Sequence, residues 1–95
     1  MNSDIQRIKE KISPVLRKAG VSRSSLFGSF ARGENNATSD VDILIEPPHG
    51  MSLIDLVGLQ MEVEQALGRK TDLVTYKALS PYLRENVLRE AITIL

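Results

Sequence analysis

Two aspartates that alternate with a valine stand where a polar stretch runs into an apolar one. The sequence GSFARGENNATSDVD, residues 28–42, ends in Asp40-Val41-Asp42. Its last two residues begin the segment VDILIE, residues 41–46, which predicts a strand because it is apolar, β-branched and followed by two prolines. Side chains alternate across a strand, so both carboxylates should lie on one face, roughly 7 Å apart. Aspartate is depleted in strands, and this alternation therefore suggests a function.

A third carboxylate lies in KTDLVTY, residues 70–76, which predicts another strand. If that strand neighbours residues 41–46 in the sheet, Asp72 joins the face of Asp40 and Asp42. Carboxylates held in this way suit Mg²⁺, which typically takes one or two of them together with substrate phosphates. A pair of such ions suits in-line displacement at phosphorus. The alternative is that the three aspartates are ordinary turn or solvent-facing residues, which would be the better interpretation of an isolated pair.

Gly28 and Ser29 open the same stretch, after a strand predicted over residues 23–27. A glycine turn between a strand and a helix lets backbone N–H groups approach a phosphate closely, and the Ser29 hydroxyl can donate to the same oxygen. Arg32 can pair with a phosphate or, with equal weight, with Asp40 and its neighbours as a structural ion pair. These three residues are candidate nucleotide-binding groups, although a lone Gly-Ser is most often a simple turn.

The surrounding elements predict a small α/β (α+β) domain. Apolar residues at helical spacing predict helices over residues 3–19 and 52–67. Pro14 lies inside the first pattern, so we expect a kink or a break near Ser13. The apolar stripe of the second helix is expected to face the core. Ser80 and Pro81 open a last helix.

The residues after that helix, 92–95, are expected to form a short strand or a docking tail. The order of elements predicts a mixed sheet of three to four strands flanked by helices. We expect one domain over residues 1–95.

Composition narrows the class of function. The chain has 95 residues, and its twelve basic and twelve acidic residues cancel, so direct nucleic-acid binding is not expected. The absence of cysteine excludes disulfides and thiolate metal sites. No segment approaches the ~20 apolar residues of a membrane span, and no apolar signal core is present. We therefore expect no membrane association and a cytoplasmic location.

The motifs together resemble a known family. Gly28-Ser29, followed after ten residues by Asp40-Val41-Asp42, resembles the GS…DxD signature of the DNA polymerase β-type nucleotidyltransferase superfamily. The form GSFARGE…SDVDILIE, the short chain and the TDLV segment resemble the minimal nucleotidyltransferases (MNT) over nearly the whole sequence. The resemblance implies the polymerase β-like palm fold.

The same resemblance implies a role for each matching residue. Gly28 and Ser29 would bind the triphosphate of ATP. Asp40 and Asp42 would bind two Mg²⁺ ions, with Mn²⁺ as a substitute. Asp72 would complete the acidic set and help to activate the acceptor hydroxyl.

Minimal members are typically encoded beside a HEPN-domain protein and act as antitoxins. The resemblance therefore implies a hetero-oligomer with a HEPN toxin and transfer of AMP to a hydroxyl group of that partner. One alternative is a non-catalytic antitoxin that neutralises its partner by occlusion, against which the intact aspartates argue. Another is a nucleotidyltransferase for RNA or a small molecule, against which the neutral charge and the missing second domain argue.

Overall fold

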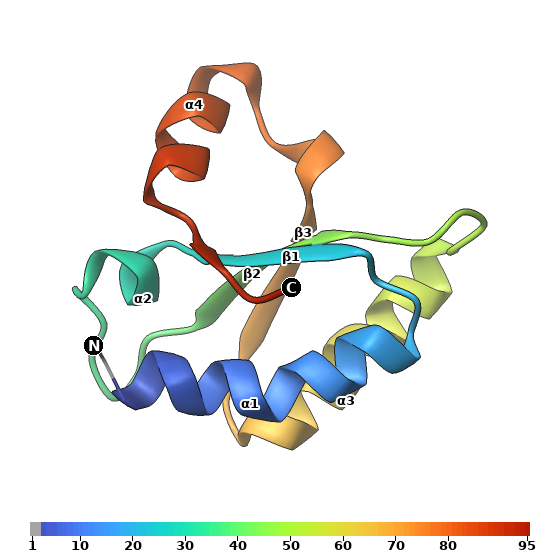
Figure 1. Cartoon of the computed structure of the whole chain (residues 1–95), viewed down its shortest axis with the longest axis horizontal. Coiled ribbons are helices and arrows are strands. Elements are labelled where there is room, and N and C mark those ends of the chain that lie inside the picture. The colour runs from blue at the N-terminus through green and yellow to red at the C-terminus, as the bar shows by residue number, and fades with distance from the viewer. Residues whose placement is uncertain (1–2) are drawn as a thin grey trace.

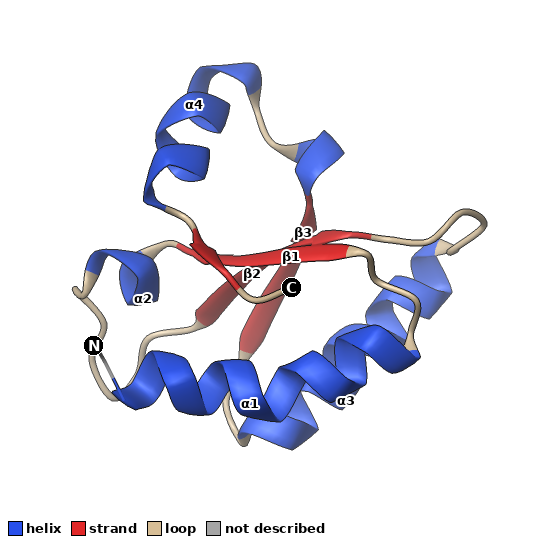
Figure 2. Ribbon diagram, viewed as in Figure 1, coloured by secondary structure: helices blue, strands red, loops and turns tan. Residues whose placement is uncertain are grey.

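The computed structural model describes residues 3–95, which form a four-stranded mixed sheet with helices on both faces (Figures 1 and 2). The helices are α1 (Ser3–Lys18), α2 (Ser29–Arg32), α3 (Leu53–Leu67) and α4 (Pro81–Glu90), with a 3₁₀ turn, η1 (Tyr76–Ala78). The strands are β1 (Arg23–Phe27), β2 (Val41–Glu46), β3 (Thr71–Thr75) and β4 (Ile92–Thr93). The predicted fold class is confirmed, and the last residues contribute the short strand rather than only a docking tail.

The order of the strands decides which residues meet. The sheet runs β3-β2-β1-β4, and β1 pairs antiparallel with both β2 and β4. The strands β2 and β3 are parallel and are joined by a crossover through α3. In their register Asp42 lies opposite Asp72, and residues opposite each other in neighbouring strands point to the same face. The topology therefore brings these two aspartates together.

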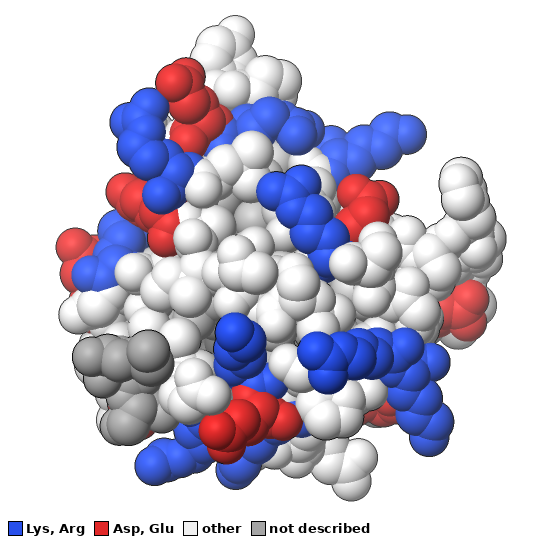
Figure 3. Space-filling model, viewed as in Figure 1, with Lys and Arg blue, Asp and Glu red and all other residues white. Residues whose placement is uncertain are grey.

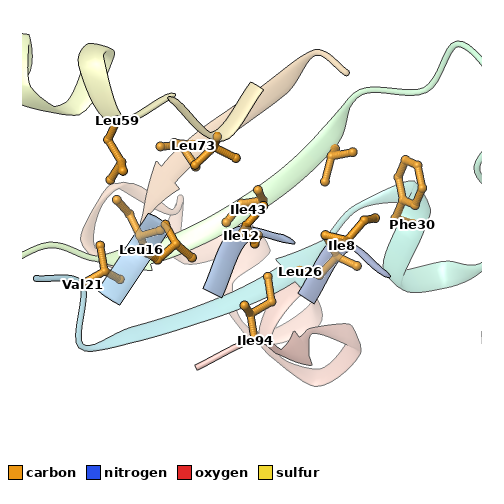
Figure 4. Packing of buried hydrophobic residues seen from close by; sticks show 13 residues of the cluster. Ile8, Ile12, Leu16, Val21, Leu26, Phe30, Ile43, Leu59, Leu73 and Ile94 are labelled. Atoms are coloured by element: carbon orange, nitrogen blue, oxygen red, sulfur yellow. The ribbon is translucent and has the colours of Figure 1, made fainter. Parts of the chain in front are cut away.

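One face of the sheet is a dry apolar core under α1 and α3 (Figures 1 and 4). Leu26 of β1 and Ile43 of β2 are fully buried there, against Ile12 and Leu16 of α1. Burying side chains of this size stabilises a fold by about 1.5–3 kcal/mol each. This face holds the strands in the register that the other face depends on.

Helix α1 runs without interruption through Ser13 and Pro14, so a break near Ser13 is a wrong prediction. Proline lacks an N–H group and disfavours a helix interior. Ile12 and Leu16 flank it and are both fully buried, which fixes the helix on the sheet from either side of the proline. The Ser13 hydroxyl also donates to the carbonyl oxygen of Lys9 in the preceding turn.

Helix α3 begins and ends at the predicted residues but buries only part of its apolar surface. A capping box joins Ser52 and Asp55 at its start, and Gly68 ends it in the left-handed region, at φ 68°. Leu59 and Val63 are buried against the core. Four large apolar side chains are instead exposed: Leu53 (75%), Ile54 (83%), Val57 (54%) and Met61 (64%). The expectation of a core-facing stripe is wrong for Leu53, Val57 and Met61, because α3 is apolar on more sides than it can bury.

The opposite face of the sheet is covered less completely, by η1 and α4 (Figure 1). Tyr76 of η1 is buried, and its hydroxyl donates to Ser25 Oγ at 2.8 Å. No residue of α4 is buried. None of the helices within residues 3–95 has the length and apolar character that a membrane span requires.

Candidate active site

Strands β2 and β3 carry three carboxylates to one end of the sheet, on the face that α4 covers. Asp40 directly precedes β2, Asp42 is its second residue, and Asp72 is the second residue of β3. Neighbouring strands lie about 4.8 Å apart, so Asp42 and Asp72 are side by side. The condition that the sequence set for Asp72, that its strand neighbours β2, is met. Asp42 is half-buried, whereas Asp40 and Asp72 are exposed.

The three carboxylates interact electrostatically. Burial raises the pKa of Asp42 above its ordinary value, and the negative charges of Asp72 and Asp40 raise it further. The cationic side chain of Arg32 acts in the opposite direction on the same pKa. Negative charge is therefore concentrated here at a cost in free energy, which a bound cation would relieve.

The Gly28-Ser29 turn lies directly against this acidic cluster. Gly28 ends the connection from β1 and precedes α2, with a left-handed φ of 73° that favours glycine. A Cβ atom at this position would overlap the carboxylate of Asp42 at Oδ2. The backbone of the turn and the second aspartate are thus in contact distance. The glycine is needed for both its conformation and its lack of a side chain.

Arg32 makes ion pairs other than those considered from the sequence. Its Nε lies 2.8 Å from Glu34 Oε1, and its Nη1 lies 3.8 Å from Glu90 Oε2 in α4. The predicted structural partner, Asp40, is not one of these two. All three side chains are substantially exposed, and exposed ion pairs of this kind contribute little to the stability of the fold. The guanidinium can therefore exchange a carboxylate for a phosphate at small cost.

Arg69 also lies near the site, in the link between α3 and β3. Its guanidinium donates to three backbone carbonyls of the loop at residues 36–39, which leads into Asp40. It also lies over the ring of Phe30 in α2, 4.9 Å from the ring centroid. These partners are 30 or more residues away along the chain, so no local pattern could have indicated them.

The single histidine and the two tyrosines of the chain lie away from the acidic cluster. His49 is exposed in the loop after β2, at the opposite end of that strand from Asp40. It lines a surface hollow of about 550 Å³ beside α3 that includes none of the three aspartates. Tyr82 is 93% exposed, whereas Tyr76 is part of the packing over the sheet. None of these groups joins the acidic cluster.

The acidic cluster provides part of the ligand set that a metal ion needs. Within the described part of the chain, no three acidic, histidine or cysteine side chains are close enough to form a complete cage. Three carboxylates nevertheless offer only oxygen donors, which suit hard cations such as Mg²⁺ and Mn²⁺. Because Mg²⁺ commonly takes its other ligands from water and substrate phosphates, the residues present fit an ion that arrives with a nucleotide.

Comparison with known proteins assigns the family. The family model described as the nucleotidyltransferase domain matches residues 7–94, nearly the whole chain. The chain belongs to the nucleotidyltransferase domain family. This nucleotidyltransferase is 49% identical over 92 residues to a Methanocaldococcus jannaschii protein named as a candidate protein adenylyltransferase, covering 97% of this chain and 99% of that protein. The resemblance seen in the GS…DxD motif is thereby confirmed, as is the enzyme class.

Two solved structures extend the comparison to the fold. One, described as a candidate minimal nucleotidyltransferase, matches with a TM-score of 0.82 and 38% identity, over 95% of this nucleotidyltransferase and 92% of that chain. The other is a crystal structure of a toxin–antitoxin with AMP-PNP. It matches with a TM-score of 0.80 and 26% identity, over 92% of this chain and 72% of that chain. The architecture of this nucleotidyltransferase is therefore that of the minimal members.

Proposed function

We propose that this nucleotidyltransferase transfers AMP from ATP to a hydroxyl group of a partner protein, and that it is the antitoxin of a HEPN/MNT pair. The proposal rests above all on the close approach of Gly28 to Asp42, with Asp72 in register beside them. A phosphate-binding turn and an acidic cluster on one surface are what transfer of a nucleotidyl group requires.

Each residue has a distinct role in this proposal. The backbone N–H groups of the turn and the Ser29 hydroxyl donate to the triphosphate, and Arg32 leaves its exposed carboxylates to pair with a phosphate oxygen. Asp40 and Asp42 would hold Mg²⁺, or Mn²⁺ in its place, with Asp72 completing the acidic set. The ions, when bound, would neutralise phosphate charge and lower the pKa of the acceptor hydroxyl.

The reaction is a displacement at the α-phosphorus of ATP. The acceptor oxygen forms a bond to that phosphorus, and the bond from it to the pyrophosphate oxygen breaks. Asp72 accepts the hydroxyl proton, and pyrophosphate leaves with its electron pair. The products are an AMP ester of the acceptor and pyrophosphate.

Three observations support a protein acceptor. The 49% identical relative is named for adenylyl transfer to protein, and a similar solved structure is a toxin–antitoxin with AMP-PNP. Apolar side chains of α3 and α4 are exposed where a partner could cover them, among them Ile54 (83%) and Tyr82 (93%). The twelve basic and twelve acidic residues of the chain cancel, so no net charge attracts nucleic acid, and the face in Figure 3 exposes side chains of both signs. A cytoplasmic location belongs to the same proposal.

The proposal is tested by a transfer assay with the protein encoded by the neighbouring gene. Purified enzyme, Mg²⁺ and that protein are incubated with ATP labelled at either the α- or the γ-phosphate, beside the Asp40→Ala/Asp42→Ala double variant. We expect label from the α-position only, and only with the intact aspartates. Removal of Mg²⁺ with a chelator should stop transfer, and added Mg²⁺ or Mn²⁺ should restore it.

Two outcomes would contradict the proposal. Transfer by the double variant would remove the assigned role of the aspartates. A neighbour that is bound and silenced equally by both versions, with no label on it, would instead support neutralisation by occlusion.

A further inference from the structure

The loop that joins α2 to β2 leads directly to the first aspartate of the cluster (Figure 1). Residues 36–39 of this loop form a turn closed by its own side chains. Asn36 Oδ1 accepts from the backbone N–H and the hydroxyl of Thr38, at 2.9 and 2.8 Å, and Ser39 Oγ accepts from the Asn36 N–H at 2.9 Å. These bonds define the shape of the turn. They do not define where the turn lies relative to the sheet.

The Arg69 side chain links this turn to the rest of the protein. Its Nη2 donates to the carbonyl oxygens of Asn36 (3.2 Å), Ala37 (3.3 Å) and Ser39 (2.7 Å). The shortest of these bonds is to the residue directly before Asp40. Within residues 3–95, the hydrogen bonds that connect residues 36–39 to other elements come from Arg69. Beyond this loop, the next hydrogen bond to another element is donated by the Val41 N–H to the Lys70 carbonyl at 3.0 Å, so residues 36–39 themselves are held to the rest of the protein through one side chain.

The same guanidinium also contacts the helix that follows the Gly-Ser turn. It lies 4.9 Å from the centroid of the Phe30 ring, and Phe30 is buried and adjacent to Ser29. An arginine suits this double contact because its planar group stacks on an aromatic ring and donates along its edge. Arg69 itself lies in the link between α3 and β3, two residues before Thr71, the first residue of β3. One side chain thus contacts two of the segments that carry candidate site residues, and it belongs to the link that leads into the third, β3.

We propose that Arg69 is a positioning residue that holds Asp40 in the geometry needed for metal binding beside Asp42. The proposal rests on the function proposed above for Asp40. Asp40 is exposed and precedes the strand, so the sheet alone does not restrain it as it restrains Asp42. Loss of the arginine side chain would leave all three aspartates in the protein but would widen the range of positions that Asp40 samples. The expected defect is weaker use of Mg²⁺ rather than weaker folding.

The first experiment measures AMP transfer against Mg²⁺ concentration for Arg69→Ala and for a matched control, Lys70→Ala. The Lys70→Ala substitution removes an equal charge from the adjacent position, where the lysine side chain is exposed. For Arg69→Ala we expect activity at limiting Mg²⁺ to fall about 10- to 100-fold, as it does when a group supporting a metal ligand is lost. Saturating Mg²⁺ should recover part of the lost activity. Lys70→Ala should follow the wild-type curve of activity against Mg²⁺. The curve of Arg69→Lys should lie between those of wild type and Arg69→Ala, because lysine restores the charge but not the forked guanidinium group.

A second measurement does not depend on activity. Amide hydrogen exchange of Ser39 and Asp40 should be faster in Arg69→Ala than in wild type or Lys70→Ala, while exchange in β2 should be unchanged.

The outcomes separate this proposal from the function on which it rests. If wild type transfers AMP and Arg69→Ala has the wild-type Mg²⁺ curve, the positioning role is overturned and the function stands. If wild type transfers nothing, the function fails, and unchanged exchange at Ser39 would overturn the restraint as well. Should Arg69→Ala fail to fold, Arg69→Lys carries the same comparison, and a wild-type curve for it with unchanged exchange would overturn the proposal.

Discussion

The two faces of the sheet use the same strands for different purposes. Facing α1 and α3, Ile43 is fully buried in an apolar core. One residue earlier, on the other face, Asp42 is half-buried beside Asp72, and burial together with its acidic neighbours raises its pKa. Because side chains alternate along a strand, β2 supplies stability to one face and concentrated charge to the other. The comparison indicates that fold and activity can be changed separately by mutating adjacent residues.

Asp42→Asn should give the largest difference between the effect on activity and the effect on stability. The substitution keeps the volume of the side chain but removes the charge that binds metal, so transfer should fall at least about 100-fold, in line with several kcal/mol for metal-ion catalysis. The thermal unfolding midpoint should stay the same or rise, because a repelled charge is lost. Transfer assays and thermal melts on the same preparation check both parts. Substantial transfer with Mg²⁺ present would show that the charged face is not the site.

A second test concerns the contact between the turn and the charged face. Gly28→Ala adds a Cβ at φ 73° that would overlap Asp42, so we expect a loss of about 1–3 kcal/mol in the free energy of unfolding and a loss of transfer of about 10-fold or more. Gly33→Ala is the matched control. It has nearly the same φ, 72°, but nothing within 4 Å of the added atom. Equal activity losses in both variants would attribute the effect to backbone strain instead of the contact with Asp42.

The apolar face should give the reverse result. Ile43→Val removes one methylene from the core and should lower the free energy of unfolding by about 1 kcal/mol. That corresponds to a melting midpoint about 4–8 °C lower for a domain of this size. Transfer per folded molecule, measured well below the midpoint, should stay at the wild-type level. A loss of transfer without a loss of stability would mean that the two faces are coupled.

The smallest expected effect is a dependence of stability on pH. The pKa of Asp42 lies above its ordinary 3.8 in the folded protein, so the folded state binds this proton more tightly than the unfolded state does. Wild type should therefore lose stability relative to Asp42→Asn as pH rises from 3.8 through the raised pKa, and the difference should level off above it. Urea unfolding of both proteins in chelator-containing buffers measures this. A difference in stability that does not change with pH would mean that the pKa of Asp42 is not raised in the folded protein.

Much of this architecture was predictable because its signals are local. Val41–Glu46 is apolar and β-branched with prolines after it, and Ser52 and Gly68 are good cap residues at the two ends of α3. The sequence placed Asp72 beside Asp42 on the condition that the two strands are neighbours, and the sheet meets that condition. The roles of the aspartates and of the Gly-Ser turn stay predictions.

Other features depend on contacts between distant segments and could not be predicted. Arg69 reaches a loop 30 residues before it, and Arg32 pairs with Glu90 of the last helix. In α3, Val57 and Met61 are exposed although they match a helical apolar pattern. The helix is apolar on several sides, so periodicity alone does not determine which side packs on the sheet.

The crossover between β2 and β3 has a consequence for how the enzyme is made. Asp42 and Asp72 are partners in the sheet but are thirty residues apart along the chain, with α3 between them. Such pairings form late, because the intervening loop must close before any contact compensates for its entropy. During synthesis the chain holds Gly28 and Asp40 well before it holds Asp72. A nascent protein therefore carries the complete GS…DxD motif without a complete acidic cluster until β3 docks.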